Sequence, residues 1–341
     1  MPINANRNQG ARNRLVTALR RGDSLALVGA GVSIWAGYGS WDQVIEHLAG
    51  AVRAARPEVD TQRIIQNNQN PLHCAKHLGA YLGPSFAEFI QTEFGPNGKK
   101  LNDLLFRLCS LPFKHLLTLN FDYSLEQIHG ALARAYRSLS TRNLPDLVKF
   151  MRSHHGTDVE RCVLHLHGTF SDSPEYIALT NDGYARLYQD GTLFRKFIWW
   201  LTTAKCLVFL GFGFTDSDFL HAIRQAAWDL QEERDPIHFA LRGIRPDQND
   251  EAIRNEYNDS YKIDPIFYEL AADPQNRHAG FATLIEGIAA DLELPAVVPP
   301  AGLPEDGVPV AAPEPDDLRR AEQLAEELIE KLDPGGDVVP R

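Results

Sequence analysis

Two glycine-containing turns are the first features of this sequence that could do chemistry. Residues 29–33 read GAGVS after an apolar segment, and residues 211–218 read GFGFTDSD after another. Glycines between a strand and a helix let backbone N–H groups approach a phosphate, and the helix start favours its negative charge. Each turn alone is as typical of a structural connection as of a nucleotide site, because the full dinucleotide fingerprint is absent.

Polar side chains follow two further apolar segments. The sequence TLNFD at 118–122 places Asn120 and Asp122 after one of them, and HLHG at 165–168 places His165 and His167 at the end of the other. Side chains two residues apart share a strand face, so the two histidines could line one cleft or bind a metal. The spacing provides no third ligand, which disfavours the metal. Asn120 as a helix cap and a histidine satisfied within the core are the structural alternatives.

Acidic residues at 216 and 218 follow the second glycine turn. Asp216 could hold ribose hydroxyls, or it could simply cap the helix that begins there. Capping is the simpler interpretation of this residue.

Six short apolar segments must form the strands that position these side chains. They alternate with helical patterns, which predicts an α/β fold with a doubly wound, mostly parallel, Rossmann-like sheet. The stretch at about 42–110 is helical almost throughout and predicts a helical insertion. The six segments lie at 24–28, 116–119, 163–166, 207–210, 237–241 and 263–267.

The composition of the chain changes near residue 295. We expect one folded domain over residues 1–294, then a linker rich in Pro, Ala and acidic residues at 295–315. Residues 316–333 have the heptad spacing of an amphipathic helix, and two heptads are too few to stand alone. This helix therefore needs a partner, either its own domain or another chain.

The bulk properties exclude several classes of protein. Hydrophobic residues make up 44% of the 341 residues and charged residues 23%, as in ordinary globular enzymes. The formal net charge of −11 disfavours direct nucleic-acid binding. The four cysteines are scattered and form no CxxC pair, which disfavours a zinc ribbon or a disulfide framework. Residues 1–10 lack the apolar core of a secretory signal, and Lys205 interrupts the most apolar stretch. We expect a soluble, cytoplasmic protein with no membrane segment.

Taken in order, the motifs at 29–33, 118–122, 167–168 and 211–213 resemble those of the sirtuin superfamily. The resemblance spans about residues 25–230 and includes the bacterial sirtuin-like branch of antiphage defence, whose members degrade NAD. Trp41 and the segment 181–184 are similar to that branch. Deacetylating sirtuins carry a zinc module of paired CxxC motifs, which the cysteines here do not supply. The resemblance therefore implies that NAD is a substrate. The missing CxxC motifs imply that no zinc is bound and put protein deacylation in doubt.

The resemblance also implies roles for individual residues. Asn120 and His167 would flank the scissile ribose, where an Asn can position water and a neutral imidazole can accept a proton. Asp122 would meet the nicotinamide carboxamide. The first turn would contact the NAD pyrophosphate through Gly29, Ala30, Gly31 and Ser33. The second turn would approach the adenosine ribose through Gly211 and Gly213.

The function that the resemblance implies is an NAD glycohydrolase that acts as an antiphage effector. An NADase that is always active would kill its host. We therefore expect its activity to be regulated by homo-oligomerisation or by a partner such as a HerA-type ATPase or a short Argonaute. An NAD-dependent deacylase or ADP-ribosyl transferase is one alternative. A non-catalytic assembly subunit that binds NAD or ADP-ribose is another.

Overall fold

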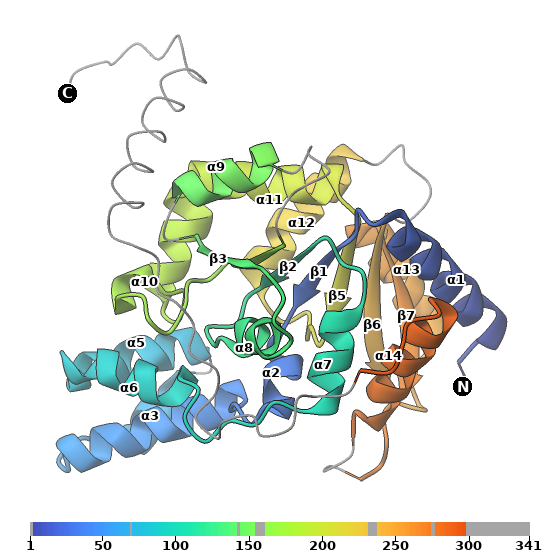
Figure 1. Cartoon of the computed structure of the whole chain (residues 1–341). Coiled ribbons are helices and arrows are strands. Elements are labelled where there is room, and N and C mark those ends of the chain that lie inside the picture. Colours follow the sequence, from blue (N-terminus) through green and yellow to red (C-terminus); the bar gives the residue numbers. More distant parts are fainter. Residues whose placement is uncertain are drawn as a thin grey trace.

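A single parallel sheet forms the centre of the molecule (Figure 1). The computed structural model describes residues 3–68, 70–141, 144–153, 161–230, 237–273 and 277–297. Within these ranges the strand order is β3-β4-β2-β1-β5-β6-β7, and each neighbouring pair is parallel. The strands are β1 (Leu25–Val28), β2 (His115–Thr118), β3 (Arg137–Ser140), β4 (Cys162–His165), β5 (Leu207–Leu210), β6 (His238–Ile244) and β7 (Ile263–Glu269). The predicted doubly wound, Rossmann-like α/β fold is confirmed.

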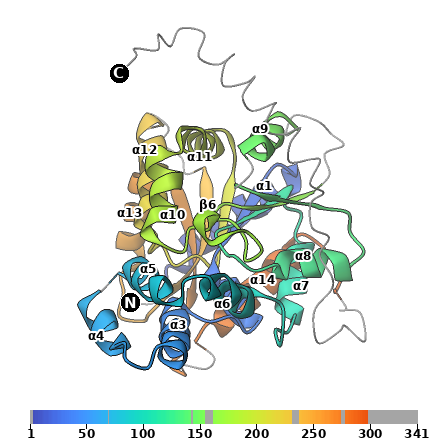
Figure 2. The ribbon, with the colours of Figure 1, turned by 90° about the vertical axis from the view of Figure 1, so that its left-hand side faces the viewer.

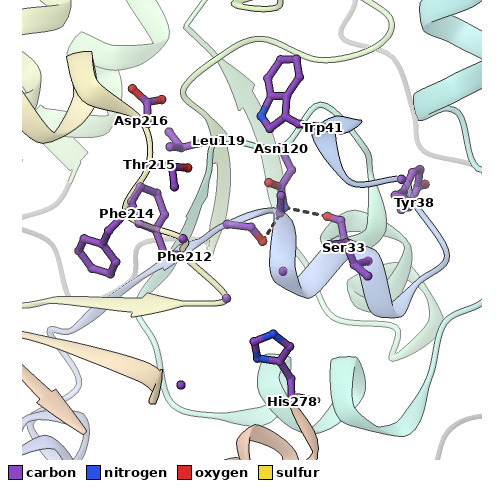
Figure 3. Close-up of a pocket in the computed structure, with 18 of the residues that line it drawn as sticks. Ser33, Tyr38, Trp41, Leu119, Asn120, Phe212, Phe214, Thr215, Asp216 and His278 are labelled. Atoms are coloured by element: carbon purple, nitrogen blue, oxygen red, sulfur yellow. Dashed lines mark hydrogen bonds between the residues drawn. The ribbon is translucent and has the colours of Figure 1, made fainter. Parts of the chain in front are cut away.

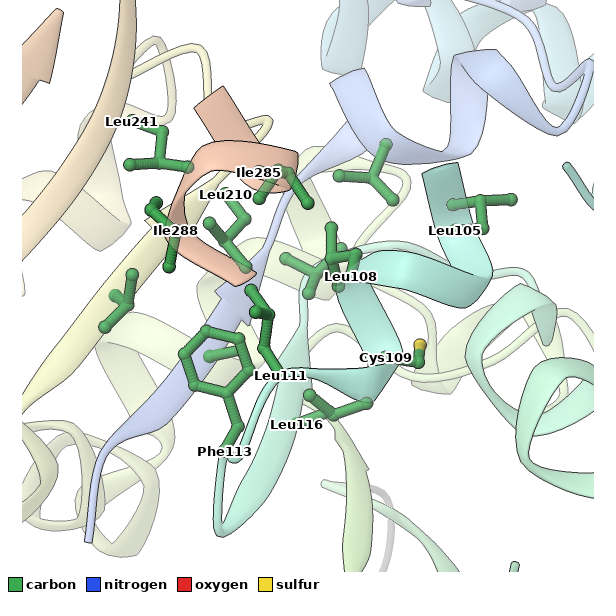
Figure 4. Close-up of a cluster of buried hydrophobic side chains, with 14 of the residues drawn as sticks. Leu105, Leu108, Cys109, Leu111, Phe113, Leu116, Leu210, Leu241, Ile285 and Ile288 are labelled. Carbon is green, nitrogen blue, oxygen red and sulfur yellow. The ribbon is translucent and has the colours of Figure 1, made fainter. Parts of the chain in front are cut away.

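Helices cover both faces of the sheet, which explains why its strands read as continuous apolar runs. Ala26 and Val28 of β1 point into one core, and Leu25 and Leu27 point into the other. The first core, seen in Figure 4, is closed by α1 (Ala5–Arg21), α7 (Asp103–Ser110), α8 (Ser124–Ala131) and α14 (Ala279–Asp291). The second is closed by α9 (Leu144–Ser153), α11 (Thr192–Ala204), α12 (Ser217–Asp229) and α13 (Asp250–Tyr261).

A group of helices between β1 and β2 has a hydrophobic core of its own. After α2 (Ala30–Trp35), the chain forms α3 (Trp41–Ala55), α4 (Thr61–Asn67), α5 (Pro71–Leu82) and α6 (Ser85–Phe94). Leu48 and Leu78 are fully buried in this core, which also takes in Phe121 from the sheet edge. Figures 1 and 2 show α3, α5 and α6 gathered at one end of the molecule. Of the stretch predicted as an insertion, α7 instead packs on the main sheet.

The sequence patterns did not predict β3. This strand lies at the edge of the sheet, and only Leu139 of its four residues is buried. An edge strand with one buried side chain leaves no apolar run to detect. The predicted helix at 316–333 and, from residue 298 on, the predicted linker lie outside the described residues. Within the described ranges, no helix is long and apolar enough to cross a membrane.

Candidate active site

The two glycine turns lie where the winding of the sheet reverses direction. β1 is central, and the chain builds β2, β3 and β4 on one side of it before β5, β6 and β7 on the other. Ligands of open α/β sheets bind at such a switch point, beyond the carboxyl ends of the strands. A cavity of about 990 Å³ lies there, lined by the turns that follow β1, β2 and β5.

All the residues predicted for the site line this one cavity. The chain separates them by up to about 180 positions, and the sheet brings them to the same edge. They are Gly29, Ala30, Gly31, Ser33, Asn120, Asp122, His167, Gly211 and Gly213. Their individual roles toward NAD remain predictions.

The glycine turns pack directly against each other. Gly31 donates its N–H to the Gly211 carbonyl at 3.0 Å, and Gly29 donates to the Leu210 carbonyl at 2.9 Å. A Cβ atom at Gly29 or Gly31 would lie 2.7 or 2.8 Å from the Gly211 oxygen. Gly211 itself has a φ of +61°, a conformation that glycine adopts without strain. Close approach of the two turns is therefore a structural reason for these glycines, in addition to any contact with phosphate.

The Asn120 side chain is fixed by two hydrogen bonds (Figure 3). Its Nδ2 group donates to Ser33 Oγ at 2.7 Å and to the Gly29 carbonyl at 3.1 Å. An amide has only two N–H donors, so both are used. The polar group that Asn120 has left for a ligand is its carbonyl oxygen, Oδ1, which can accept a hydrogen bond from a water molecule.

Ser33 and Asp122 continue this network away from Asn120. Ser33 Oγ donates to Asp122 Oδ2 at 2.6 Å, and the other carboxylate oxygen accepts from the Ser124 N–H at 3.0 Å and from the Ser124 hydroxyl. Ser33 is only 6% exposed and Asp122 only 5%. In this structure, both side chains hold Asn120 in place. Their predicted contacts with pyrophosphate and carboxamide remain predictions.

His167 lies in a buried polar group on the same cavity. Its Nε2 is 2.7 Å from the Tyr188 hydroxyl and 3.8 Å from Asp216 Oδ2, and the Tyr184 ring packs edge-on against the imidazole. Burial lowers the pKa of His167, and the Asp216 charge opposes that shift only in part. The imidazole is therefore neutral at physiological pH and can accept a proton.

His165 does not share this cleft. It is fully buried, with Nδ1 2.9 Å from the Asn120 carbonyl oxygen and Nε2 2.8 Å from Glu126 Oε1. β4 ends at His165, so the strand alternation that would align the two histidines does not extend to His167. The interpretation in which both line one cavity is therefore wrong for His165.

Two comparisons with known proteins give matches to this sequence. Residues 114–266 match the family model described as the SIR2-like domain. The chain is also 25% identical over 235 residues to NAD(+) hydrolase ThsA from Enterococcus faecium, an alignment that covers 68% of this chain and 45% of that protein. The chain thus spans about half the length of this curated relative. The predicted resemblance to sirtuin-like proteins is confirmed.

Further residues line the cavity, most of them not predicted from the sequence. Tyr184 donates its hydroxyl hydrogen to Asp216 Oδ2 at 2.8 Å, while Asp216 Oδ1 caps α12 by accepting from the Phe219 N–H at 3.0 Å. Asp216 therefore caps the helix and also serves the cavity. Basic and aromatic groups from the ends of β6 and β7 and from the start of α14 close the far side, where Figure 3 shows His278: Arg242, Arg245, Tyr268, Arg277 and His278.

The position of the two arginines in the sequence could have predicted their place at the cavity. Arg242 and Arg245 follow the strand predicted at 237–241, so the rule that placed Asn120 at the sheet edge applies to them too. Arg242 lies over the Phe214 ring at 6.0 Å and donates to the Gly213 carbonyl at 3.4 Å. For metals, no cluster of three or more His, Cys, Asp or Glu side chains is placed to hold an ion in the part of the chain that the structure describes.

Proposed function

We propose that this chain is an NAD glycohydrolase, which hydrolyses the bond between nicotinamide and ribose with NAD as its substrate. The observation that carries the proposal is that Asn120 and His167 line one cavity together with both glycine turns. The SIR2-like match and the 25% identity to a protein named as an NAD(+) hydrolase support it. Binding pockets for small molecules usually measure roughly 300–1,000 Å³, and this cavity of about 990 Å³ is at the upper end.

Asn120 directs the attacking water in the proposed reaction. Its Oδ1 accepts a hydrogen bond from the water, whose lone pair then faces the anomeric carbon of the ribose. The carbon–nitrogen bond breaks, its electron pair goes to the pyridinium ring, and neutral nicotinamide leaves. Positive charge grows on the ribose in this transition state, and a fixed amide oxygen stabilises it without reorganising.

His167 takes up the proton that the water loses. With its hydrogen on Nε2, donated to the Tyr188 oxygen, the imidazole presents Nδ1 as the basic nitrogen. The Asp216 carboxylate, 3.8 Å from Nε2, stabilises the imidazolium that results. The products are nicotinamide, ADP-ribose and one proton, so the atoms balance.

The test is release of nicotinamide from NAD by the purified full chain, followed by chromatography with and without lysate of phage-infected cells as a source of activator. We expect Asn120→Ala and His167→Ala to lose about two to four orders of magnitude in rate. His73→Ala, at an exposed position on α5, is the matched control. Wild type without turnover under every condition, or Asn120→Ala as active as wild type, refutes the proposal. Consumption of acetyl-lysine peptide with NAD would favour the deacylase, and NAD binding without turnover would favour the assembly subunit.

We further propose that NAD cleavage serves antiphage defence in the cytoplasm, restrained by self-assembly or by a partner protein. The resemblance to the defence branch supports this proposal, and a HerA-type ATPase or a short Argonaute remains a candidate partner. Phage plaque counts and cellular NAD should both fall in cells that carry the wild-type gene and its neighbours. With Asn120→Ala, neither should fall; equal protection by both forms would separate defence from NAD cleavage.

A further inference from the structure

A buried ion pair lies behind Asn120, outside the cavity. His165 at the end of β4 and Glu126 in α8 are both fully buried, and Nε2 and Oε1 lie 2.8 Å apart. Glu126 Oε1 also accepts a hydrogen bond from Ser138 Oγ at 2.7 Å. The proposed cleavage chemistry does not use this pair, yet it contacts the backbone of Asn120.

Among the described residues, the N–H and the carbonyl of Asn120 are bonded by side chains and not by backbone. The last backbone bonds between strands here are those of Leu119 N–H to the Val28 carbonyl and of Leu166 N–H to the Thr118 carbonyl. Asn120 lies one residue beyond this ladder. Its N–H donates to Thr118 Oγ1 at 3.0 Å, and its carbonyl oxygen lies 2.9 Å from His165 Nδ1. Without His165, this carbonyl would lose the bond that fixes the plane of the peptide.

The hydrogen positions on the His165 ring follow from its partners. A carbonyl oxygen only accepts, so Nδ1 carries a hydrogen and donates it to Asn120. Burial by itself lowers the pKa of His165, but the charge and hydrogen bond of Glu126, the Asn120 carbonyl and the Asp122 charge raise it, and the net shift is upward. The Tyr123 ring packs edge-on against the imidazole at 5.6 Å. An acceptor lies beside each ring nitrogen, so both nitrogens are placed to donate.

Stability alone does not explain a charged pair at this position. Well-packed apolar residues of similar volume often stabilise a protein as much as a buried ion pair does. Within the described part of the chain, Glu126 Oε2 has no hydrogen-bond partner. What an apolar pair cannot provide is an N–H aimed at the Asn120 carbonyl.

We propose that His165, oriented by Glu126, is a positioning residue for NAD cleavage: it fixes the Asn120 peptide so that Oδ1 of the side chain faces the ribose. This inference rests on the proposed NAD glycohydrolase function. A catalytic group that is misplaced by about 1 Å can lose about two orders of magnitude in rate. The effect should therefore appear in kcat and much less in KM.

Two matched double variants test the proposal. Glu126→Leu with His165→Leu removes the charges and the donor, while Glu126→Gln with His165→Asn removes the charges but keeps an amide donor near Nδ1. We expect the Leu pair to lower kcat by about 10- to 100-fold with KM changed less than about threefold, and the amide pair to recover most of that loss. Equal kcat for the two variants, whether high or low, overturns the proposal.

A second measurement on the wild-type chain needs neither folding of the variants nor turnover. In a histidine side-chain nitrogen NMR spectrum at pH 7, His165, assigned by through-bond correlation of its ring to its own backbone, should carry hydrogens on both ring nitrogens. An unprotonated Nδ1 overturns the hydrogen-bond scheme and the proposal with it. Wild type that cleaves no NAD would refute the proposed function, whereas this spectrum decides the positioning contact independently.

Discussion

Replacing Gly31 by Ala tests the packing of the two glycine turns. The new Cβ would lie 2.8 Å from the Gly211 oxygen and 3.2 Å from its Cα atom, whereas ordinary contacts of this kind begin near 3.4 Å. The turn after β5 would have to move by about 0.6 Å, the difference between 3.4 and 2.8 Å. Because the contact atoms belong to the backbone, no side chain can rotate to make room.

The expected loss of stability follows from this overlap. Overpacking by one carbon costs about 1–3 kcal/mol. Alanine within a helix recovers about 0.5–1 kcal/mol relative to glycine, and Gly31 lies in α2. With mid-range values for both effects, the net loss is about 1.3 kcal/mol. At roughly 2–4 °C per kcal/mol, the Tm should fall by roughly 3–5 °C.

Gly213→Ala is the matched control for this loss. Its new Cβ would meet nothing nearer than Thr215 Oγ1 at 3.6 Å. Gly213 is not among the glycines with a positive φ, so alanine fits the backbone there. Thermal unfolding of both variants, read by calorimetry, should show a change below about 0.5 kcal/mol at this surface position. A Gly31→Ala protein as stable as wild type, or a Gly213→Ala protein that loses more, contradicts the described packing.

Three further predictions concern charge. Asp216→Asn keeps the helix cap but removes the charge that raises the pKa of His167. The acid limb of the kcat/KM profile should therefore move to lower pH. A move to higher pH counts against His167 as the base. Arg242→Ala should raise KM for NAD about tenfold with little change in kcat, if an arginine-to-phosphate bond of about 1.5 kcal/mol or more is lost; unchanged KM excludes Arg242 from binding. The free energy of unfolding should fall as the pH drops below about 6.5, because three buried histidines stay neutral in the folded chain but become protonated in the unfolded chain. Each can contribute up to about 1.4 kcal/mol per pH unit. Equal urea midpoints at pH 7.5 and 5.5 would refute this. Burial lowers the pKa of His115 and of His129 to about 4, and that of His238 to about 3.

The sheet was predictable from the sequence because most of its strands are buried on both sides. β1, β2, β4 and β5 have four buried residues each, so each reads as an apolar run. β3 reads RSLS, with polar residues around one buried leucine. Such a strand depends on pairing with β4, a tertiary contact that local sequence does not reveal.

The location of the site was predictable, but its internal bonds were not. Polar residues directly after apolar strands must lie at the carboxyl edge, and Asn120 and His167, which this rule selects, line one cavity. The same rule could not show that Ser33 bonds to Asp122, a residue 89 positions away. Nor could it show that a π-helical turn at Ala185–Asp190 carries Tyr188 to His167.

The hydrogen bonds around Asn120 indicate how this site would limit its own motion. The amide is held by Ser33 and Gly29, and the peptide by Thr118 and His165. Four partners, from the ends of β2 and β4 and from the start of α2, therefore fix a single residue. Most of these groups are buried, where an unpaired donor or acceptor costs far more than at the surface. Loss of any one partner therefore leaves a polar group of Asn120 unsatisfied and free to turn. A site of this kind should lose rate when residues that never touch NAD are changed, because the chemistry depends on the direction of one amide oxygen.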